Sequence, residues 1–351
     1  MKTQKIVILV LAAIWVLPFN GFAAREEFSK KINRSFEVDK NASLVLKNKF
    51  GKINCTSWDK NSIALEVIIT VEAAGEKKAN EIMGKIDVDI SGSRSKVSAI
   101  TTFAENLPSN NNKIQVDFLI SMPAWVNLEI DHRFGDLILG EVSGNSMITL
   151  GYGNFRIQRM TGSEQVLDIK YSNGNIGYLT NAKLDLRYSG FEMDEAISMT
   201  ATSKFSKLKI GKIDALTIDS GYDDDYIGFV RDIDIKASFS NVEIRSLEEK
   251  LIASLDYGDL KIRETGRNFK LIDLTSKFAG ADIGIHSDAS FRIVASVKLG
   301  DFSYPRQKAN LSVVELSHTS SKYEGLVGEN TDTSSKVLID ARNGGVNLYF
   351  R

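Results

Sequence analysis

The densest group of chemically active side chains in the sequence is the run GYDDDY, which contains Asp223, Asp224 and Asp225. Clustered carboxylates supply the oxygen ligands that Ca²⁺ prefers. The matching places in the neighbouring segments hold Ser-Lys at 206–207 and Ser-Asn at 240–241, so no row of carboxylates forms. We therefore predict a hydrated acidic corner without a metal ion, and the alternative is a calcium site on the three aspartates.

The other reactive side chains form no catalytic or metal-binding pattern. His132, His286 and His318 lack metal-ligand spacing, and we expect His132 and His286 to be solvated histidines at strand ends. Cys55 stands where similar segments carry Ile or Leu, which predicts a buried core thiol. The chain has neither a phosphate-binding glycine loop nor a serine-nucleophile elbow. We therefore expect no catalytic residue and no cofactor.

These residues belong to a repeat, seen in RFGDLILG at 133–140 and DYGDLKIR at 256–263. An aromatic residue is followed by two turn residues and then by apolar residues at alternate positions. The second turn residue is mostly Asp, Asn or Gly, which tolerate a left-handed backbone. The aromatic markers recur every 17–21 residues, Leu299 continues the series, and we expect the markers to form a structural ladder. The aromatic members are Phe134, Tyr152, Tyr171, Tyr188, Phe205, Tyr222, Phe239, Tyr257 and Phe278.

The spacing around each marker predicts the fold. Apolar and polar residues alternate with the period of a β-strand, and the residue four places before each marker is always apolar. We predict an all-β, parallel, right-handed β-solenoid with two short strands per coil and with aliphatic and aromatic ladders between two facing sheets. In two copies the pattern slips by two residues, to Ile176/Tyr178 and Ile227/Phe229. An antiparallel meander is the alternative, and a transmembrane barrel fits less well because its strands are longer.

The pattern also divides the chain into four regions. Lys2, Lys5 and a short apolar run before small residues predict a signal peptide at 1–24. Residues 25–125 are expected to form a β-rich capping region with one helix near 75–85 and strands at 62–73, 86–91, 96–103 and 114–121. The regular repeats occupy 126–305, and 306–351 supply closing strands.

The amino-acid composition restricts the possible binding partners and the possible cellular location of the protein. Without residues 1–24 the chain has 42 Lys and Arg against 45 Asp and Glu, which leaves a net charge of −3. A nucleic-acid-binding protein normally carries a basic face, so nucleic acid is not an expected partner. The mature chain has no second apolar run long enough to span a bilayer. A single cysteine cannot form an internal disulfide, so an exported chain of this kind depends on its core for stability.

The segments LVLKNKFGKINC at 44–55 and QVDFLISMPAWVNLEIDHRFGDLILGEVSG at 115–144 resemble the bacterial putative adhesin domain family of exported proteins. The resemblance implies a right-handed β-solenoid at the cell envelope, and it transfers no catalytic residues. We expect a non-enzymatic binding or scaffolding protein in the periplasm, on the outer-membrane surface or outside the cell, with a glycan or an envelope protein as partner. One alternative is a β-helix polysaccharide lyase or hydrolase, and another is an accessory protein of an envelope signalling system.

Overall fold

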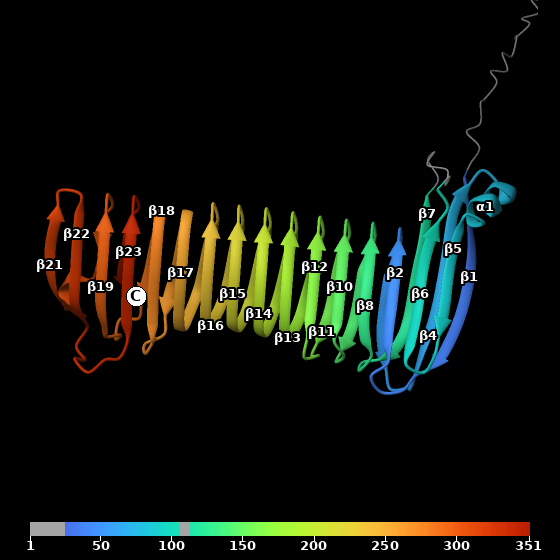
Figure 1. Cartoon of the computed structure of the whole chain (residues 1–351), viewed down its shortest axis with the longest axis horizontal. Coiled ribbons are helices and arrows are strands. Elements are labelled where there is room, and N and C mark those ends of the chain that lie inside the picture. Colours follow the sequence, from blue (N-terminus) through green and yellow to red (C-terminus); the bar gives the residue numbers. More distant parts are fainter. Residues whose placement is uncertain (1–24, 106–112) are drawn as a thin grey trace, which may run out of the picture.

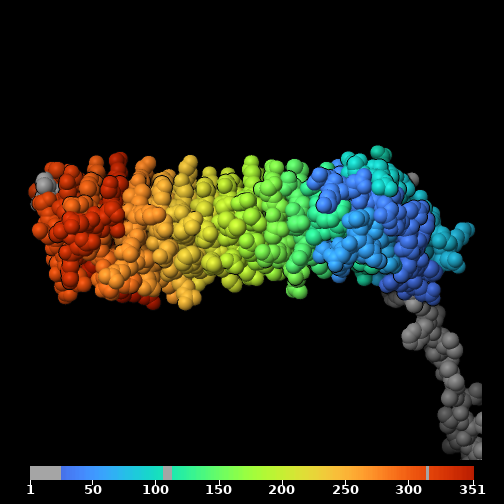
Figure 2. All heavy atoms as spheres, turned by 90° about the horizontal axis from the view of Figure 1, so that it is seen from below, coloured from blue at the N-terminus to red at the C-terminus, as the bar shows by residue number. Residues whose placement is uncertain are grey.

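The computed structural model describes residues 25–105 and 113–351, which are mostly β. The chain forms an elongated rod, and in its middle part the strands follow one another along the long axis (Figures 1 and 2). The short helix α1 (Glu76–Met83) lies at the N-terminal end, as predicted. Within the two described ranges, no helix has the length and apolar character of a membrane span. The predicted signal peptide lies outside the described residues.

The body of the rod is a stack of parallel coils, which excludes the antiparallel meander for this part of the chain. β8 pairs in parallel with β10, β10 with β12, and this continues coil by coil to β18. The strands of the body are β8 (Asn127–Arg133), β9 (Leu137–Val142), β10 (Ser146–Gly151), β11 (Asn154–Met160), β12 (Gln165–Lys170), β13 (Asn173–Arg187), β14 (Gly190–Lys204), β15 (Lys207–Gly221), β16 (Asp224–Ser238), β17 (Asn241–Thr265) and β18 (Leu271–Ile285).

The coils before β13, and those from Gly258 onward, have two strands separated by a turn, as predicted. From β13 to β16 each coil is one strand of 15 residues. The tight turn at the aromatic residue, called the corner from here on, interrupts the pairing. The opposite turn is a shallow bend, where the pairing of β13 with β14 passes over only Gly177 and Thr180. The hydrogen-bonded ladder therefore continues around this bend, which the sequence pattern had predicted as a second corner.

The register places like residues above one another in the core. Ile148 lies between Ile130 and Leu167, and all three are buried, as parallel stacking of the repeat requires. The predicted slip in two copies is wrong, because Ile227 pairs with Ile210 and Asp225 pairs with Leu208. Asp225 therefore occupies a core position, and Phe229 lies outside the core row.

The N-terminal end of the stack is closed by antiparallel strands. The first coil, β2–β3, lies between β8–β9 and the pair β6 and β7, so the capping strands cover its open side. β4 pairs antiparallel with β1 and β7, and β5 pairs antiparallel with β6. The strands are β1 (Glu26–Glu37), β2 (Ser43–Lys49), β3 (Ile53–Trp58), β4 (Ser62–Ala73), β5 (Ile86–Gly92), β6 (Lys96–Phe103) and β7 (Ile114–Pro123).

The C-terminal end is closed out of sequence order. The last coil, β23–β24, is inserted between β18 and the earlier strands β19 and β20 (Figure 1). β22 pairs antiparallel with β19 and β21, and β21 is the outermost strand. These elements are β19 (Phe291–Lys298), β20 (Phe302–Ser303), the 3₁₀ turn η1 (Arg306–Lys308), β21 (Ala309–Ser317), β22 (Ser320–Val327), β23 (Lys336–Arg342) and β24 (Val346–Phe350).

Candidate functional site

The aromatic residues of the repeat form one exposed row along the corner edge of the rod. From Phe134 to Phe278 each is 43–55% exposed, and Phe50 of the first coil extends the row by one ring. The marker residues therefore do not lie between the sheets, where an aromatic ladder was expected. That space is filled mainly by aliphatic side chains, with a few buried rings such as Phe155 and Phe191 among them. The aromatic row consists of Phe50, Phe134, Tyr152, Tyr171, Tyr188, Phe205, Tyr222, Phe239, Tyr257 and Phe278.

The rings of the aromatic row stack face to face. From Phe134 to Phe278 neighbouring ring centroids are 4.8–5.0 Å apart, with interplanar angles of 1–11°. Phe103 covers the first ring, Phe50, edge-on at 5.6 Å. Because each ring face is covered by its neighbours, the row presents ring edges and tyrosine hydroxyls to solvent. Among the described residues, none of the hydroxyls of Tyr152, Tyr171, Tyr188, Tyr222 and Tyr257 makes a hydrogen bond within the chain.

Every ring of the row stands on a left-handed backbone. The φ angles of the ten residues are 50–65°, and Leu299 and Asn343 continue the series with 52° and 56°. The turn residue two places later does not have the left-handed φ that the sequence had predicted for it. A left-handed non-glycine residue costs about 1–2 kcal/mol, and an aromatic contact contributes about 0.5–1.5 kcal/mol. Stacking between coils therefore offsets much of the backbone strain at each corner.

A ladder of serine side chains lies beneath the aromatic row. Ser189 Oγ donates a hydrogen bond to the Arg187 carbonyl oxygen (2.7 Å) and accepts one from the Ser172 backbone N–H (3.1 Å). The same pair of bonds is made by Ser172, Ser206 and Ser240, each of which is buried. The serines therefore satisfy corner N–H groups that would otherwise be unpaired. The recurring Tyr-Ser and Phe-Ser pairs in the sequence were the signal for this ladder.

Asp223 takes the serine's place in one coil. Its Oδ1 accepts a hydrogen bond from the Ser206 N–H (2.6 Å), and its Oδ2 accepts one from the Gly221 N–H (3.0 Å). Asp225 lies on the inner side of the sheet, and both aspartates are only 3% exposed. Asp224 between them points outward and accepts a hydrogen bond from Asn241 Nδ2 (3.1 Å). A hydrated acidic corner is thus correct for Asp224 and wrong for Asp223 and Asp225.

Burial dominates the protonation of the two inner aspartates. It raises the pKa of Asp225 to about 7 and also raises the pKa of Asp223, where donated hydrogen bonds oppose it. Asp225 Oδ1 and the buried Ser203 Oγ have no hydrogen-bond partner in the described chain. Among the described residues no three acidic, histidine or cysteine side chains are placed to hold a metal ion. The calcium alternative therefore lacks the converging ligands that it requires.

His132 is a second correction, because it is fully buried. Its Nδ1 lies 3.3 Å from the Asn48 carbonyl oxygen, and its Nε2 lies 3.1 Å from the Gly51 carbonyl oxygen. Desolvation lowers the pKa of His132, and the two carbonyl contacts oppose that shift. Cys55 is the buried core thiol that was predicted, and burial raises its pKa to about 12. Neither side chain is exposed to a ligand.

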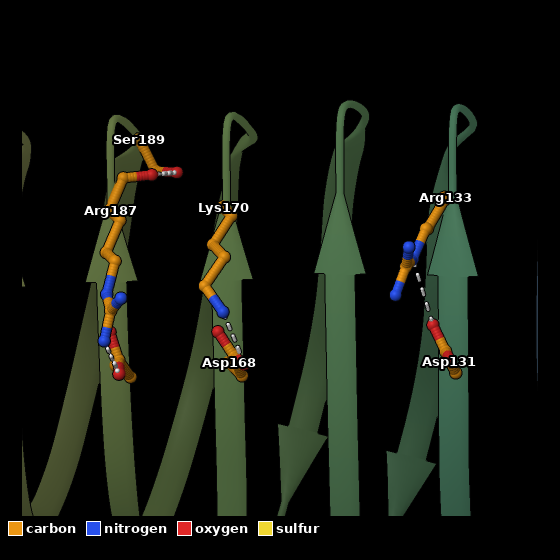
Figure 3. A network of polar contacts seen from close by, with 7 residues as sticks. Asp131, Arg133, Asp168, Lys170, Arg187 and Ser189 are labelled. Carbon is orange, nitrogen blue, oxygen red and sulfur yellow. Dashed lines mark hydrogen bonds and ion pairs between the residues drawn. The ribbon is translucent and has the colours of Figure 1, made fainter.

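The surface before the corner carries short ion pairs within single strands (Figure 3). Lys170 Nζ lies 2.9 Å from Asp168, and Arg187 donates two hydrogen bonds of 2.9 and 2.8 Å to Asp185. Arg133 makes a looser contact of 3.6 Å with Asp131. Such exposed pairs contribute little stability. They do, however, balance the basic side chains that precede the rings, so this flank of the row is of mixed charge.

The face after the corner contains a hollow of about 570 Å³ beside the middle of the aromatic row. We call it the post-corner hollow. It spans β13 to β16 and begins two residues after the rings. Its outward lining includes Asn173, Asn175, Glu192, Lys209, Asp224 and Tyr226. Nothing in the sequence pattern predicts this hollow.

No protein-family model matches the chain, and no curated protein matches it. Solved structures do match. A putative adhesin from Bacteroides fragilis is 13% identical, with a TM-score of 0.40, and the match covers 66% of this chain and 97% of that one. A putative adhesin from Parabacteroides distasonis is 10% identical, with a TM-score of 0.43, and the match covers 68% of this chain and 96% of that one. A putative adhesin from Parabacteroides merdae is 10% identical, with a TM-score of 0.35, and the match covers 67% of this chain and 94% of that one. No residue role is transferred from these structures to this chain.

Proposed function

We propose that this protein is a non-enzymatic, adhesin-like binding protein of the bacterial cell envelope, and that the aromatic row binds an extended glycan. The observation that carries the proposal is the exposed row of tyrosine hydroxyls on a rigid edge. Tyr152, Tyr171 and Tyr188 are consecutive, with ring centroids 4.8 and 5.0 Å apart. A polymer with regularly spaced hydroxyl groups can form hydrogen bonds with all three at once.

The chemistry of the row favours a glycan over a lipid surface. The ring faces are occupied by stacking, so the row offers narrow edges and hydroxyls rather than a broad apolar surface. Exposed Asn173 and Asp224 border it on one side, and the ion-paired Lys170 and Arg187 border it on the other. Polar and balanced surroundings suit a hydroxyl-rich ligand, which both donates and accepts hydrogen bonds.

The proposal of a binding protein rather than an enzyme rests on the position of the carboxyl groups. A glycosidase acid needs a raised pKa at a site that substrate reaches. The pKa is raised at Asp223 and Asp225, and both are buried, Asp223 beneath the corner and Asp225 on the inner side of the sheet. The outward Glu192 is ion-paired with Lys209 at 3.3 Å.

The test is binding of cellohexaose, mannohexaose and maltohexaose to the purified protein, measured by calorimetry. The key variant is the triple substitution Tyr152→Phe, Tyr171→Phe and Tyr188→Phe, which removes three hydroxyls and keeps the rings. Phe already occupies this position at Phe205, so the fold is retained. We expect the triple variant to bind at least about tenfold more weakly.

A matched control and two further readouts separate the alternatives. Tyr178→Phe removes a hydroxyl outside the aromatic row and should leave the affinity unchanged. Binding to phosphatidylglycerol vesicles without binding to any hexaose would replace the glycan by a lipid surface. Release of shorter sugars from the hexaoses would show an enzyme and overturn the proposal.

Export is part of the same proposal and has its own test. The basic start and short apolar run of residues 1–24 support it. Expression in a bacterial host followed by fractionation should place the protein outside the cytoplasm. N-terminal sequencing should find a chain that starts after Ala23 or Ala24, and a full-length cytoplasmic product would contradict export.

A further inference from the structure

The two sheets of the solenoid end at different places at the C-terminal end of the rod. The sheet before the corner continues past β19 through β22 to β21, whereas the sheet after the corner ends at the short strand β20. The hairpin β21–β22 therefore extends beyond the facing sheet. Val313 of β21 is 53% exposed, although it continues the row of the buried residues Ala295 and Ile339.

The outer edge of β21 is open, because no other strand of the described chain pairs with it. The Gly328 N–H donates to the Lys308 carbonyl oxygen at 2.8 Å, directly before the first pair of the β21–β22 register. Bonded residues alternate along an antiparallel strand. The even-numbered residues of β21 therefore bond to β22, and the N–H and C=O groups of Leu311 and Val313 point toward the open edge.

The composition of β21 does not protect this edge. Its sequence ANLSVVELS contains one charged residue and no lysine, arginine or proline. At the other end of the rod, β1 pairs only with β4 in the described chain, and six of its 12 residues are charged, including Lys30 and Arg34. Charged side chains and proline are the usual protection of an edge strand against pairing. The contrast favours an identical β21 edge over β1 as the partner of β21.

We propose that β21 is the interface of a two-fold homodimer, in which it pairs antiparallel with β21 of a second copy. The strand is regular from Ala309 to Glu315, and a bulge follows. The centre of the regular segment is Ser312. With the two-fold axis at Ser312, Leu311 of each copy lies opposite Val313 of the other, so the exposed Val313 gains an apolar neighbour and the open backbone groups are paired.

This pairing joins two rods end to end through one continuous sheet. The two-fold axis reverses the direction of the strands, so the aromatic rows of the two copies lie along opposite edges of the double rod. The pairing does not depend on what the aromatic row binds.

Sedimentation velocity of the purified protein over a series of concentrations tests the dimer. Val313→Pro removes an N–H group that β22 does not use, and we expect it to weaken dimerisation at least about tenfold. Leu316→Lys is the control, because it removes an exposed apolar side chain of β21 beyond the regular segment and should leave dimerisation unchanged. Circular dichroism should show that both variants are folded.

A cysteine at the two-fold axis tests the register. Residues opposite each other in a non-bonded antiparallel pair have Cα atoms about 4.5 Å apart, which suits a disulfide. Ser312→Cys should therefore give a covalent dimer with oxidised glutathione as the oxidant, and the native Cys55 is buried. Asn310→Cys is the matched control on the same exposed face. It lies opposite residue 314 of the second copy and should stay monomeric on a non-reducing gel.

The other outcomes would each overturn the proposal. A monomer at every concentration, without a covalent dimer of Ser312→Cys, would exclude a second copy as the partner of β21. A dimer that Val313→Pro leaves intact would place the interface elsewhere, and equal cross-linking of Asn310→Cys would exclude the axis at Ser312. Longer assemblies would indicate pairing of β21 with β1. A complex of monomeric protein with an extended segment of another protein, lost in Val313→Pro, would replace the second copy by that segment.

Discussion

Ser220 links the two buried aspartates, because its Oγ lies 3.0 Å from Asp223 Oδ2 and 2.7 Å from Asp225 Oδ2. A hydroxyl has one hydrogen and can donate it to only one carboxylate. Asp223 also accepts two backbone N–H groups, which suits an ionised carboxylate. Asp225 completes the arrangement when it is protonated and donates to Ser220. The geometry and the raised pKa of Asp225 therefore lead to the same protonation state.

This arrangement predicts that stability falls as the pH rises through neutrality. The pKa of Asp225 is about 7 in the folded chain against an ordinary value of 3.8, so the folded state binds the extra proton between these two pH values. The stabilisation is complete below pH 3.8 and is lost as the pH rises through about 7. We expect the ionisation of Asp225 to lower the free energy of unfolding by on the order of 2–4 kcal/mol between pH 4 and pH 8.

Asp225→Asn isolates this effect, because the amide can donate to Ser220 as the protonated carboxyl does. Urea unfolding at pH 5 and pH 8 should show the variant close to the wild type at pH 5 and more stable at pH 8. Asp87→Asn, at an exposed position of β5 in the N-terminal cap, should leave the pH dependence of the wild type unchanged. Equal pH slopes in the wild type and Asp225→Asn would contradict a protonated Asp225.

The serine ladder predicts a cost for a single missing hydroxyl. Ser189→Ala removes the acceptor of the Ser172 N–H and the donor to the Arg187 carbonyl oxygen inside a buried corner. An unpaired buried polar group costs about 1–3 kcal/mol, and we expect a loss of that size in thermal or urea unfolding. The exposed Ser238→Ala is the control and should be near neutral. A neutral Ser189→Ala would mean that water replaces the hydroxyl.

The left-handed corners predict an unusual order of substitutions at Phe205. Phe205→Ala and Phe205→Asn both remove the ring that stacks on Tyr188 and Tyr222. Asn tolerates the φ of 53° better than Ala. We therefore expect Phe205→Asn to be less destabilising than Phe205→Ala, with a difference of about 1 kcal/mol. Phe205→Tyr keeps the ring and should be neutral, and a less stable Asn variant would contradict strain at the corner.

Much of the fold could be predicted because the repeat is periodic. Apolar residues four places before each marker identify the core row, and Ile130 and Ile148 are buried as expected. The alternation also gave the strand at 62–73, which matches β4, and the helix near 75–85. These features could be predicted because each depends on a pattern of nearby residues.

What could not be predicted depended on neighbouring coils. Each aromatic residue is in phase with the core residues before it and out of phase with those after it, so the alternation alone does not decide its side of the sheet. The left-handed φ turns it outward. At Asp225 the polarity of the side chain suggested a slip in register, but stacking on Leu208 and Val242 holds the coil in place. β23 and β24 are inserted between β18 and β19, and nothing in the residues near these strands indicates this long-range pairing.

The register itself predicts where a charge prevents folding. Ile210 and Ile244 are fully buried in the row that also contains Ile227. An aspartate there would place an unpaired charge between the sheets, so Ile210→Asp and Ile244→Asp should each cost more than about 4 kcal/mol. Their exposed neighbours provide matched controls, because Lys209→Asp and Arg245→Asp change the charge outside the core. Expression, circular dichroism and thermal unfolding of the four variants should give two unfolded and two folded proteins, and cooperative melting of Ile244→Asp near the wild-type temperature would contradict this register.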